Sequence, residues 1–310
     1  MKIGFFGTPE HSAILLKSLI DSGFEISFVV TNMDKPQGRD RKLTPSFVKR
    51  LARENNIPVL QFNSLKEDSA IQDINSYNAE IYIVYAFGSI IPRKIFDFPV
   101  GKTINLHGSI LPEFRGASPL QAAILNNYKE TGITLQYITD ELDAGSIISI
   151  AKVNIEDSDT FGTLLEKLTN LGVAEIIRLL KSFSGKPFQS IDQDHNKATF
   201  CKKIKVEERK LDFNYSDIEI HNKIRAFNPG NICFTSFRDK RLNVYKTTKT
   251  ELSSEEKTGS LQILDKKTFG VVCGNKKIIV LDEVQFENKK VMKSSDFING
   301  SRPLNGEMFI

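Results

Sequence analysis

The amino-acid sequence predicts an α/β domain with a mostly parallel sheet, followed by a small β-rich domain of barrel or sandwich type. Three observations predict this division. Strand-like apolar runs alternate with helix-like runs over about the first 185 residues, which is the pattern of a parallel sheet. Gly, Pro, Ser and polar residues then dominate residues 184–205, as in a linker. Short alternating segments separated by turn residues follow, and they are typical of a small barrel or sandwich.

The first domain is expected over residues 1–188, and local signals define its elements. Thr8 is a candidate N-cap, Pro9 suits the first position of the first helix, and Gly23 ends that helix. Pro45 begins the second helix, and Pro119 lies near the start of the third. The strands are expected at residues 2–7, 25–31, 58–62, 79–86, 103–107, 132–138 and 146–155, and the helices at residues 10–22, 45–56, 119–127 and 158–183.

A linker is expected over residues 189–205, and the second domain over residues 206–310. One helix, residues 216–227, precedes the strands of this domain. The strands are expected at residues 233–237, 241–248, 259–265, 270–274 and 277–286. A chain of 310 residues is long enough for both domains to bury a core.

Composition and charge exclude several classes of protein. No apolar run approaches the roughly 20 residues that span a bilayer, and the N-terminus lacks a signal-peptide pattern. The three cysteines are widely spaced and the four histidines are scattered, so neither a disulfide framework nor a metal site is expected. We therefore expect a cytoplasmic protein that binds no metal, with a monomer as the default state.

The net charge is divided unequally along the chain. Residues 201–310 carry 21 basic and 15 acidic side chains, whereas residues 1–200 carry 21 and 23. The basic last third is either a solvated, lysine-rich surface or a face that attracts a polyanion such as nucleic acid. Charge alone does not decide between these two interpretations.

The glycines after the first strand do not indicate a dinucleotide site. Gly4 and Gly7 form GxxG rather than GxGxxG, and Asp34 lies in a polar loop beyond the second strand. Gly7 is better explained by a tight turn from strand to helix.

Two polar residues end the expected strand at residues 103–107. Asn105 and His107 are two residues apart, so their side chains point to the same side of the strand. Asp143 lies in the turn "LDAG" after another strand, and neighbouring strands would bring it into the same crevice. An amide donor, an imidazole and a carboxylate suit acyl transfer to an amine. No residue is evidently built as a nucleophile, which favours direct transfer, although His107 alone could equally be structural.

The segment "NLHGSILPEFRGASPLQAAI" and the later "TGITLQYITDELDAG" closely resemble the folate-dependent formyltransferases. The N-terminal "GFFGTPE", the loop "DKPQGRDRKLTPSFVK" and "RAFNP" resemble the members of that family that formylate methionyl-tRNA. The resemblance implies a Rossmann-like domain, with helices on both faces of a mostly parallel sheet, followed by a small OB-like barrel. It also implies an enzyme that transfers a formyl group from 10-formyltetrahydrofolate to the α-amine of initiator methionyl-tRNA during translation initiation.

The same resemblance assigns roles to individual residues. Asn105, His107 and Asp143 match the catalytic trio: Asn105 and a protonated His107 would stabilise the formyl oxygen, and Asp143 would help to pass the amine's proton through water. The folate-binding segments would be Ser109, Ile110, Leu111 and Pro112, and Ala86, Phe87, Gly88 and Ile90.

The loop at residues 32–45 would contact the acceptor end of the tRNA through Lys35, Arg39, Arg41 and Lys42. Arginine suits this role because its planar fork donates two parallel hydrogen bonds. A charged solvent loop is the alternative interpretation. The chain departs from the family at Gly230 and Asn231, where a Trp-Pro pair is usual, which puts the local packing at the domain junction in doubt.

Three other functions stay open at this point. A sugar-nucleotide formyltransferase would share the folate machinery but would need neither the basic loop nor the basic tail. A glycinamide ribonucleotide formyltransferase would lack the second domain. A non-catalytic RNA-binding protein would have no need for Asn105, His107 and Asp143 together.

Overall fold

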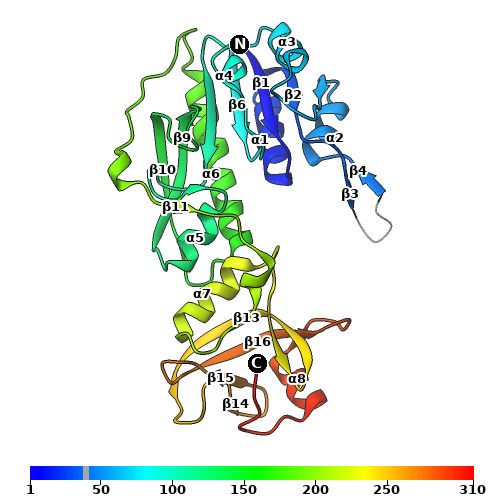
Figure 1. Cartoon of the computed structure of the whole chain (residues 1–310), viewed down its shortest axis with the longest axis vertical. Coiled ribbons are helices and arrows are strands. Elements are labelled where there is room, and N and C mark those ends of the chain that lie inside the picture. Colours follow the sequence, from blue (N-terminus) through cyan, green and yellow to red (C-terminus); the bar gives the residue numbers. More distant parts are fainter. Residues whose placement is uncertain (38–41) are drawn as a thin grey trace. The chain divides into compact units, whose positions relative to one another are not determined.

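The computed structural model describes residues 1–37 and 42–310, and these residues form two compact units. Unit 1 comprises Met1–Pro119, Glu130–Asn154 and Leu165–Cys201. Unit 2 comprises Leu120–Lys129, Ile155–Leu164 and Lys202–Ile310 (Figure 1). The domain boundaries expected from the sequence stay a prediction, and the packing assigns most of the expected linker, up to Cys201, to unit 1.

Unit 1 is built on a seven-stranded sheet in the order β10-β9-β7-β6-β1-β2-β5. Strands β5, β2, β1, β6 and β7 run parallel, whereas β9 is antiparallel to β7 and β10 is antiparallel to β9. The mostly parallel sheet predicted from the sequence is therefore confirmed. The strands are β1 (Lys2–Gly7), β2 (Glu25–Val30), β5 (Val59–Leu60), β6 (Ile81–Tyr85), β7 (Thr103–His107), β9 (Glu130–Tyr137) and β10 (Ile147–Asn154).

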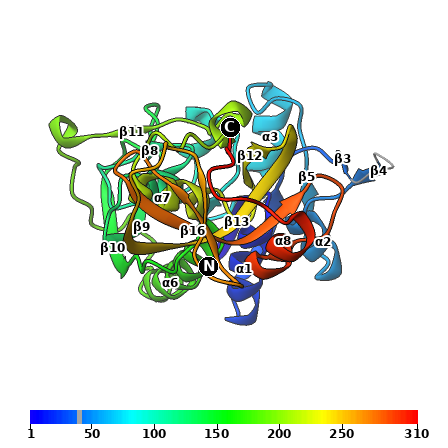
Figure 2. The ribbon, with the colours of Figure 1, turned by 90° about the horizontal axis from the view of Figure 1, so that it is seen from below.

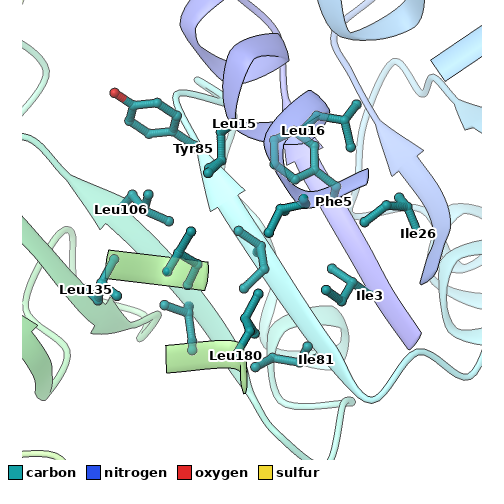
Figure 3. Packing of buried hydrophobic residues seen from close by; sticks show 14 of the residues in the cluster. Ile3, Phe5, Leu15, Leu16, Ile26, Ile81, Tyr85, Leu106, Leu135 and Leu180 are labelled. Atoms are coloured by element: carbon teal, nitrogen blue, oxygen red, sulfur yellow. The ribbon is translucent and has the colours of Figure 1, made fainter. Parts of the chain in front are cut away.

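Helices cover both faces of this sheet because consecutive side chains of a strand point to opposite faces. Phe5 packs with residues of α1, α2 and α6, and Figure 3 shows this cluster with Leu15, Leu16 and Leu180. Phe6 packs on the other face with residues of α3 and α4. The helices are α1 (Glu10–Asp21), α2 (Phe47–Glu54), α3 (Asp68–Ser76), α4 (Arg93–Phe96), α5 (Pro119–Leu125) and α6 (Phe161–Lys181), of which α5 and α6 extend across both units.

The N-cap expected at Thr8 is wrong. Pro9 occupies the N-cap of α1, and the Thr8 hydroxyl instead accepts a hydrogen bond of 3.3 Å from the backbone N–H of Asn32. Ser46 caps α2, because its hydroxyl accepts from the backbone N–H of Lys49. Helices α3 and α4 were not expected, since both are short, with nine and four residues.

Unit 2 contains an antiparallel sheet in the order β12-β13-β16-β15-β14, with β17 paired to β16. Figure 2 shows β12, β13 and β16 of this sheet. All five expected strands and the expected helix are present, whereas β17 and α8 were not expected. The OB-like barrel stays a prediction. The elements are α7 (Asp217–Phe227), β12 (Cys233–Phe237), β13 (Lys240–Ser253), β14 (Leu261–Ile263), β15 (Phe269–Val272), β16 (Lys277–Phe286), β17 (Met292–Lys293) and α8 (Ser294–Ser301).

The motif "RAFNP" lies at the end of α7 and fixes the segment that precedes α6. The buried Arg225 donates two hydrogen bonds of 3.0 Å, to the backbone carbonyls of Glu156 and Asp159. Asn228 accepts a hydrogen bond from the backbone N–H of Gly162. Both contacts lie within unit 2.

Short elements surround the ends of the large sheet in unit 1. They are the hairpin β3 (Lys35–Gln37) with β4 (Lys42–Thr44), the parallel pair β8 (Arg115–Gly116) with β11 (Phe200–Cys201), and a 3-10 turn at His195–Lys197. A second 3-10 turn, at Val206–Arg209, belongs to unit 2. Over the part of the chain that the structure describes, no helix is both long and apolar enough to cross a bilayer.

Candidate active site

Asn105 and His107 lie at the carboxyl end of β7, between β6 and β9. Their side chains meet the carboxylate of Asp143, which follows β9 in the sequence. Asn105 Nδ2 lies 3.5 Å from Asp143 Oδ1, and His107 Nδ1 lies 3.5 Å from the same oxygen. The structure thus brings the three expected catalytic side chains together, but not because two carboxyl ends are neighbours: β9 runs antiparallel to β7, its last residue Tyr137 lies opposite Ile104, and the segment after β9 brings Asp143 back to Asn105 and His107.

The carboxylate of Asp143 is held by stronger hydrogen bonds on both oxygens. The backbone N–H of Gly116 donates to Oδ2 at 2.9 Å, and Gln136 Nε2 donates to Oδ1 at 3.1 Å. Only 10% of the Asp143 side chain is exposed. Its backbone has a φ of +52°, in the left-handed region that few non-glycine residues adopt.

Both ring nitrogens of His107 face oxygen atoms. Nε2 lies 3.0 Å from the backbone carbonyl oxygen of Phe114, so it donates to that carbonyl. Nδ1 faces Asp143 Oδ1 at 3.5 Å. With Nε2 donating to the carbonyl, Nδ1 is an acceptor in the neutral ring and a second donor only in the imidazolium. The longer contact at Nδ1 leaves that nitrogen the freer of the two to engage another acceptor.

The expected folate segment Ser109–Pro112 forms a turn fixed to β9. Thr134 Oγ1 donates to the carbonyl of Ser109 at 2.6 Å and accepts from the N–H of Leu111 at 3.2 Å. Ser109 and Leu111 are buried, whereas Ile110 and Pro112 are half-buried. The peptide bond between Leu111 and Pro112 is cis.

The second expected folate segment lies directly after β6. Ala86 and Gly88 have φ angles of +49° and +78°, which form a sharp turn that buries Phe87 and leaves Ile90 80% exposed. Asn32 Nδ2 donates to the Phe87 carbonyl at 2.8 Å. This turn lines a hollow with residues from the ends of β2 and β5, and Phe87, Ser89 and Ile90 are among its walls.

The expected tRNA loop is a hairpin in its described part, with Lys35 on β3 and Lys42 on β4, both exposed. Arg39 and Arg41 lie outside the described residues. At the base of the hairpin, Lys49 Nζ donates to Asp34 Oδ2 at 2.7 Å. This hydrogen bond, together with one from Gln61, lowers the pKa of Asp34.

Two family models match the chain. One describes a formyl transferase and matches residues 1–180, and the other describes the formyl transferase C-terminal domain and matches residues 203–302. A methionyl-tRNA formyltransferase of Leptospira interrogans is 48% identical over the full length of both chains. That of Bacillus subtilis is 34% identical over 99% of this chain and 97% of its own. The chain belongs to the methionyl-tRNA formyltransferase family.

Solved structures of other formyltransferases share the fold. The sugar 3N-formyl transferase WlaRD, in the presence of dTDP and 5-N-formyl-THF, superposes with a TM-score of 0.69 at 21% identity, over 94% of this chain and 99% of its own. An N-formyltransferase of Helicobacter canadensis, in complex with folinic acid and dTDP-3-aminofucose, gives a TM-score of 0.70 at 20% identity, over 91% and 98%. Membership of the methionyl-tRNA formyltransferase family confirms the enzyme class predicted from the sequence.

Three buried polar side chains at the site were not predicted. Gln136 contacts the Asp143 carboxylate from β9. Gln193 contacts Gln136, and Arg115 in turn donates to Gln193. A polar residue within the apolar run "GITLQYI" is a signal that could have identified Gln136. Neither Gln193, in a polar stretch, nor Arg115, between Phe114 and Gly116, stands out in the sequence.

Among residues 1–37 and 42–310, no group of three His, Cys, Asp or Glu side chains has an arrangement that could hold a metal ion.

Proposed function

We propose that this protein transfers the formyl group of 10-formyltetrahydrofolate directly to the α-amine of initiator methionyl-tRNA, for translation initiation. One observation carries the proposal: an amide, an imidazole and a carboxylate converge at the carboxyl end of β7, in a chain that aligns along all its residues with a methionyl-tRNA formyltransferase. The folate and the tRNA are the substrates that the names of this family and of its structural neighbours imply.

In the proposed reaction, the neutral amine attacks the formyl carbon and the formyl oxygen gains negative charge. In the proposed mechanism His107 is protonated, so that Nδ1 as well as Asn105 Nδ2 is a donor. Each lies 3.5 Å from one anionic oxygen and can turn from it to the new oxyanion. Asp143 receives the proton that the amine loses, through water. The bond between the formyl carbon and the folate nitrogen then breaks, and the proton held by Asp143 passes through water to that nitrogen.

The chemistry of Cys201 favours direct transfer over a covalent acyl-enzyme. Its thiol is half-buried and lies 3.4 Å from the carbonyl oxygens of Phe114 and Arg115. Burial raises the pKa of the Cys201 thiol, and the negative charge of Asp143 raises it further. A thiol that resists ionisation is a poor nucleophile.

We further propose that the two turns that follow β6 and β7 bind the folate, and that the β3–β4 hairpin binds the tRNA acceptor end. The folate residues would be Ser109, Ile110, Leu111 and Pro112, with Ala86, Phe87, Gly88 and Ile90. The hairpin would present Lys35 and Lys42 to the phosphates, together with Arg39 and Arg41.

A formylation assay tests the reaction. The purified protein is given 10-formyltetrahydrofolate with methionyl-tRNA, with a 4-amino sugar nucleotide, or with no acceptor. We expect formyl-methionyl-tRNA, and kcat lower by about 10²–10³-fold in Asn105→Ala, since one oxyanion donor is typically worth that much. A formylated sugar nucleotide would overturn the proposed substrate, and near-normal turnover of Asn105→Ala, His107→Ala or Asp143→Ala would remove that residue from the mechanism.

The role of the hairpin is tested separately. The double variant Lys35→Ala/Lys42→Ala should raise the KM for methionyl-tRNA and flatten its salt dependence, because two phosphate contacts are lost. Its KM for the folate should stay unchanged. A parallel rise in both KM values would instead assign the hairpin a structural role.

A further inference from the structure

We propose that Gln193 is a positioning residue that sets the orientation of the Asp143 carboxylate, through its own amide and that of Gln136. This inference rests on the function proposed above, because it concerns the same carboxylate. Gln193 belongs to the polar stretch that the sequence analysis expected to be a linker, yet only 5% of the residue is exposed.

The amide of Gln193 has partners at both ends. Its Oε1 accepts hydrogen bonds from Arg115 Nε at 3.1 Å and from Arg115 Nη2 at 2.7 Å. Its Nε2 lies 2.9 Å from the backbone carbonyl oxygen of Asp143, 2.7 Å from that of Gly145 and 3.2 Å from Gln136 Oε1. One side chain thus ties together β8, β9 and the turn that carries Asp143.

These contacts define which end of each amide donates. A guanidinium group only donates, so Arg115 requires the oxygen of Gln193 on its side. The amide nitrogen of Gln193 must then face the turn, where its two N–H groups donate to the nearer carbonyls of Asp143 and Gly145. Gln136 turns its oxygen toward this nitrogen, at 3.2 Å, because its own NH2 group there would bring two donors together. The nitrogen of Gln136 is consequently left to face Asp143 Oδ1, at 3.1 Å. Arg115 therefore fixes, through two amides, a hydrogen-bond donor on the catalytic carboxylate.

The same side chain supports the backbone of Asp143. A non-glycine residue with a φ of +52° is strained by about 1 kcal/mol or more, and it persists where its surroundings hold it. Gln193 donates to the carbonyls of Asp143 and Gly145, on both sides of Ala144, and so holds this turn.

A purely structural role for Gln193 would be to attach its segment to unit 1, but other contacts already do so. Ile191 forms a two-way backbone bridge with Ile147, and the Thr199 hydroxyl accepts from the N–H of Phe114 at 2.8 Å. Strand β11 also pairs with β8. A variant at residue 193 retains these anchors, so docking of the segment and positioning of Asp143 can be separated.

The test compares Gln193→Met, which keeps the length of the side chain and removes its hydrogen bonds, with Gln189→Met, an exposed position of the same segment. We expect kcat to fall about 10- to 100-fold in Gln193→Met, as for a displaced catalytic group, with both KM values within about threefold of wild type. Gln189→Met should match the wild type. Gln193→Glu should not rescue kcat, because a carboxylate presents only acceptors to the two turn carbonyls.

A double-mutant cycle separates positioning from general damage. If Gln193 acts through Asp143, then Gln193→Met should lower kcat less than about twofold in an Asp143→Asn background. Equal losses in both backgrounds, or near-normal kcat in Gln193→Met alone, would overturn the inference. Should Gln193→Met fail to fold, Gln136→Met interrupts the same path from β9 and replaces it in the cycle.

A structural measurement distinguishes failure of this inference from failure of the proposed function. Crystal structures of the wild type and Gln193→Met should show the Asp143 carboxylate displaced by about 1 Å or more, the scale at which catalysis is lost. An unmoved carboxylate would refute the positioning role whichever amine the enzyme uses. A wild-type protein that does not formylate methionyl-tRNA would refute the proposed function alone.

Discussion

Gly116→Ala tests how the short β8–β11 pair contributes to the active site. Gly116 has a φ of +120°, and a Cβ atom there would lie 2.1 Å from the carbonyl oxygen of Cys201 on β11. Because that oxygen belongs to the backbone, it cannot turn away, so the two strands must separate. The N–H of Gly116, which donates to Asp143 Oδ2 at 2.9 Å, moves with its strand.

The structure sets the magnitude of the effect. A glycine-only φ costs about 1–3 kcal/mol, and the two ladder hydrogen bonds that flank Gly116 contribute about 1 kcal/mol each. We therefore expect the free energy of unfolding to fall by about 4 kcal/mol. The lost hydrogen bond to a charged group is worth about 1.5–3 kcal/mol, which corresponds to a fall in kcat of roughly 10- to 100-fold.

Urea denaturation measures the first quantity, and formylation of methionyl-tRNA at saturating folate measures the second. Gly185→Ala is the matched control, because Gly185 has a φ of +79° but no heavy atom lies within 4 Å of the place that a Cβ atom would take. The control should lose about 1 kcal/mol of stability and no activity. A folded Gly116→Ala enzyme with more than half of the wild-type kcat would show that the β8–β11 pair does not position Asp143.

Three further predictions concern stability. Burial lowers the pKa of His11 to about 4, so its neutral form stabilises the fold above pH 6.5 and this contribution is lost as the pH falls toward 4. In urea denaturation, the free energy of unfolding of His11→Phe should therefore differ less between pH 7 and pH 5 than that of the wild type. Lys49→Met should destabilise the protein at pH 7 but less at pH 3. The Lys49–Asp34 ion pair lowers the pKa of Asp34, so it stabilises the fold only while this carboxyl is ionised, and the contribution is lost as the pH falls. Urea midpoints of the variant and the wild type at both pH values measure this difference. Arg225→Met should lower the free energy of unfolding by about 3 kcal/mol in urea denaturation, since it leaves a buried backbone carbonyl, at Asp159, and a partly buried one, at Glu156, without their donor.

The elements that the sequence predicts best are those with a strong period. The bounds of β1, β7, β12 and β16 match the expected runs residue for residue, because apolar or alternating side chains continue along the whole strand. Helices α3, α4 and α8 were not expected, since each has at most nine residues and a weak apolar pattern. The short strands β8 and β11 have two residues each, which is too few to show any period.

The residues of the candidate site likewise differ in how far the sequence predicts them. The period of two along β7 is enough to place Asn105 and His107 on one side. The approach of Asp143 depends on the segment after β9, because β9 runs antiparallel to β7 and ends opposite Ile104. Gln193 could not be found by such reasoning, because a stretch of Ser, Asp, Gln and Asn has the composition of a linker whether or not it is buried. Its burial depends on contacts with β8 and β9, about 50–80 residues earlier in the chain.

The site residues that the sequence predicts differ from those that it does not predict for a physical reason, and this reason bears on how the site works. Parallel strands place catalytic residues at their carboxyl ends, but the side chains of these residues are still free to rotate. A carboxylate in a turn has further freedom in its backbone. Fixing it requires donors from outside the sheet, and here they come from Gly116, whose strand pairs with β11, and from Gln136, whose amide is oriented by Gln193. Both routes depend on residues 193–201, so the stretch with the least pattern in the sequence supplies the rigidity that the reaction requires.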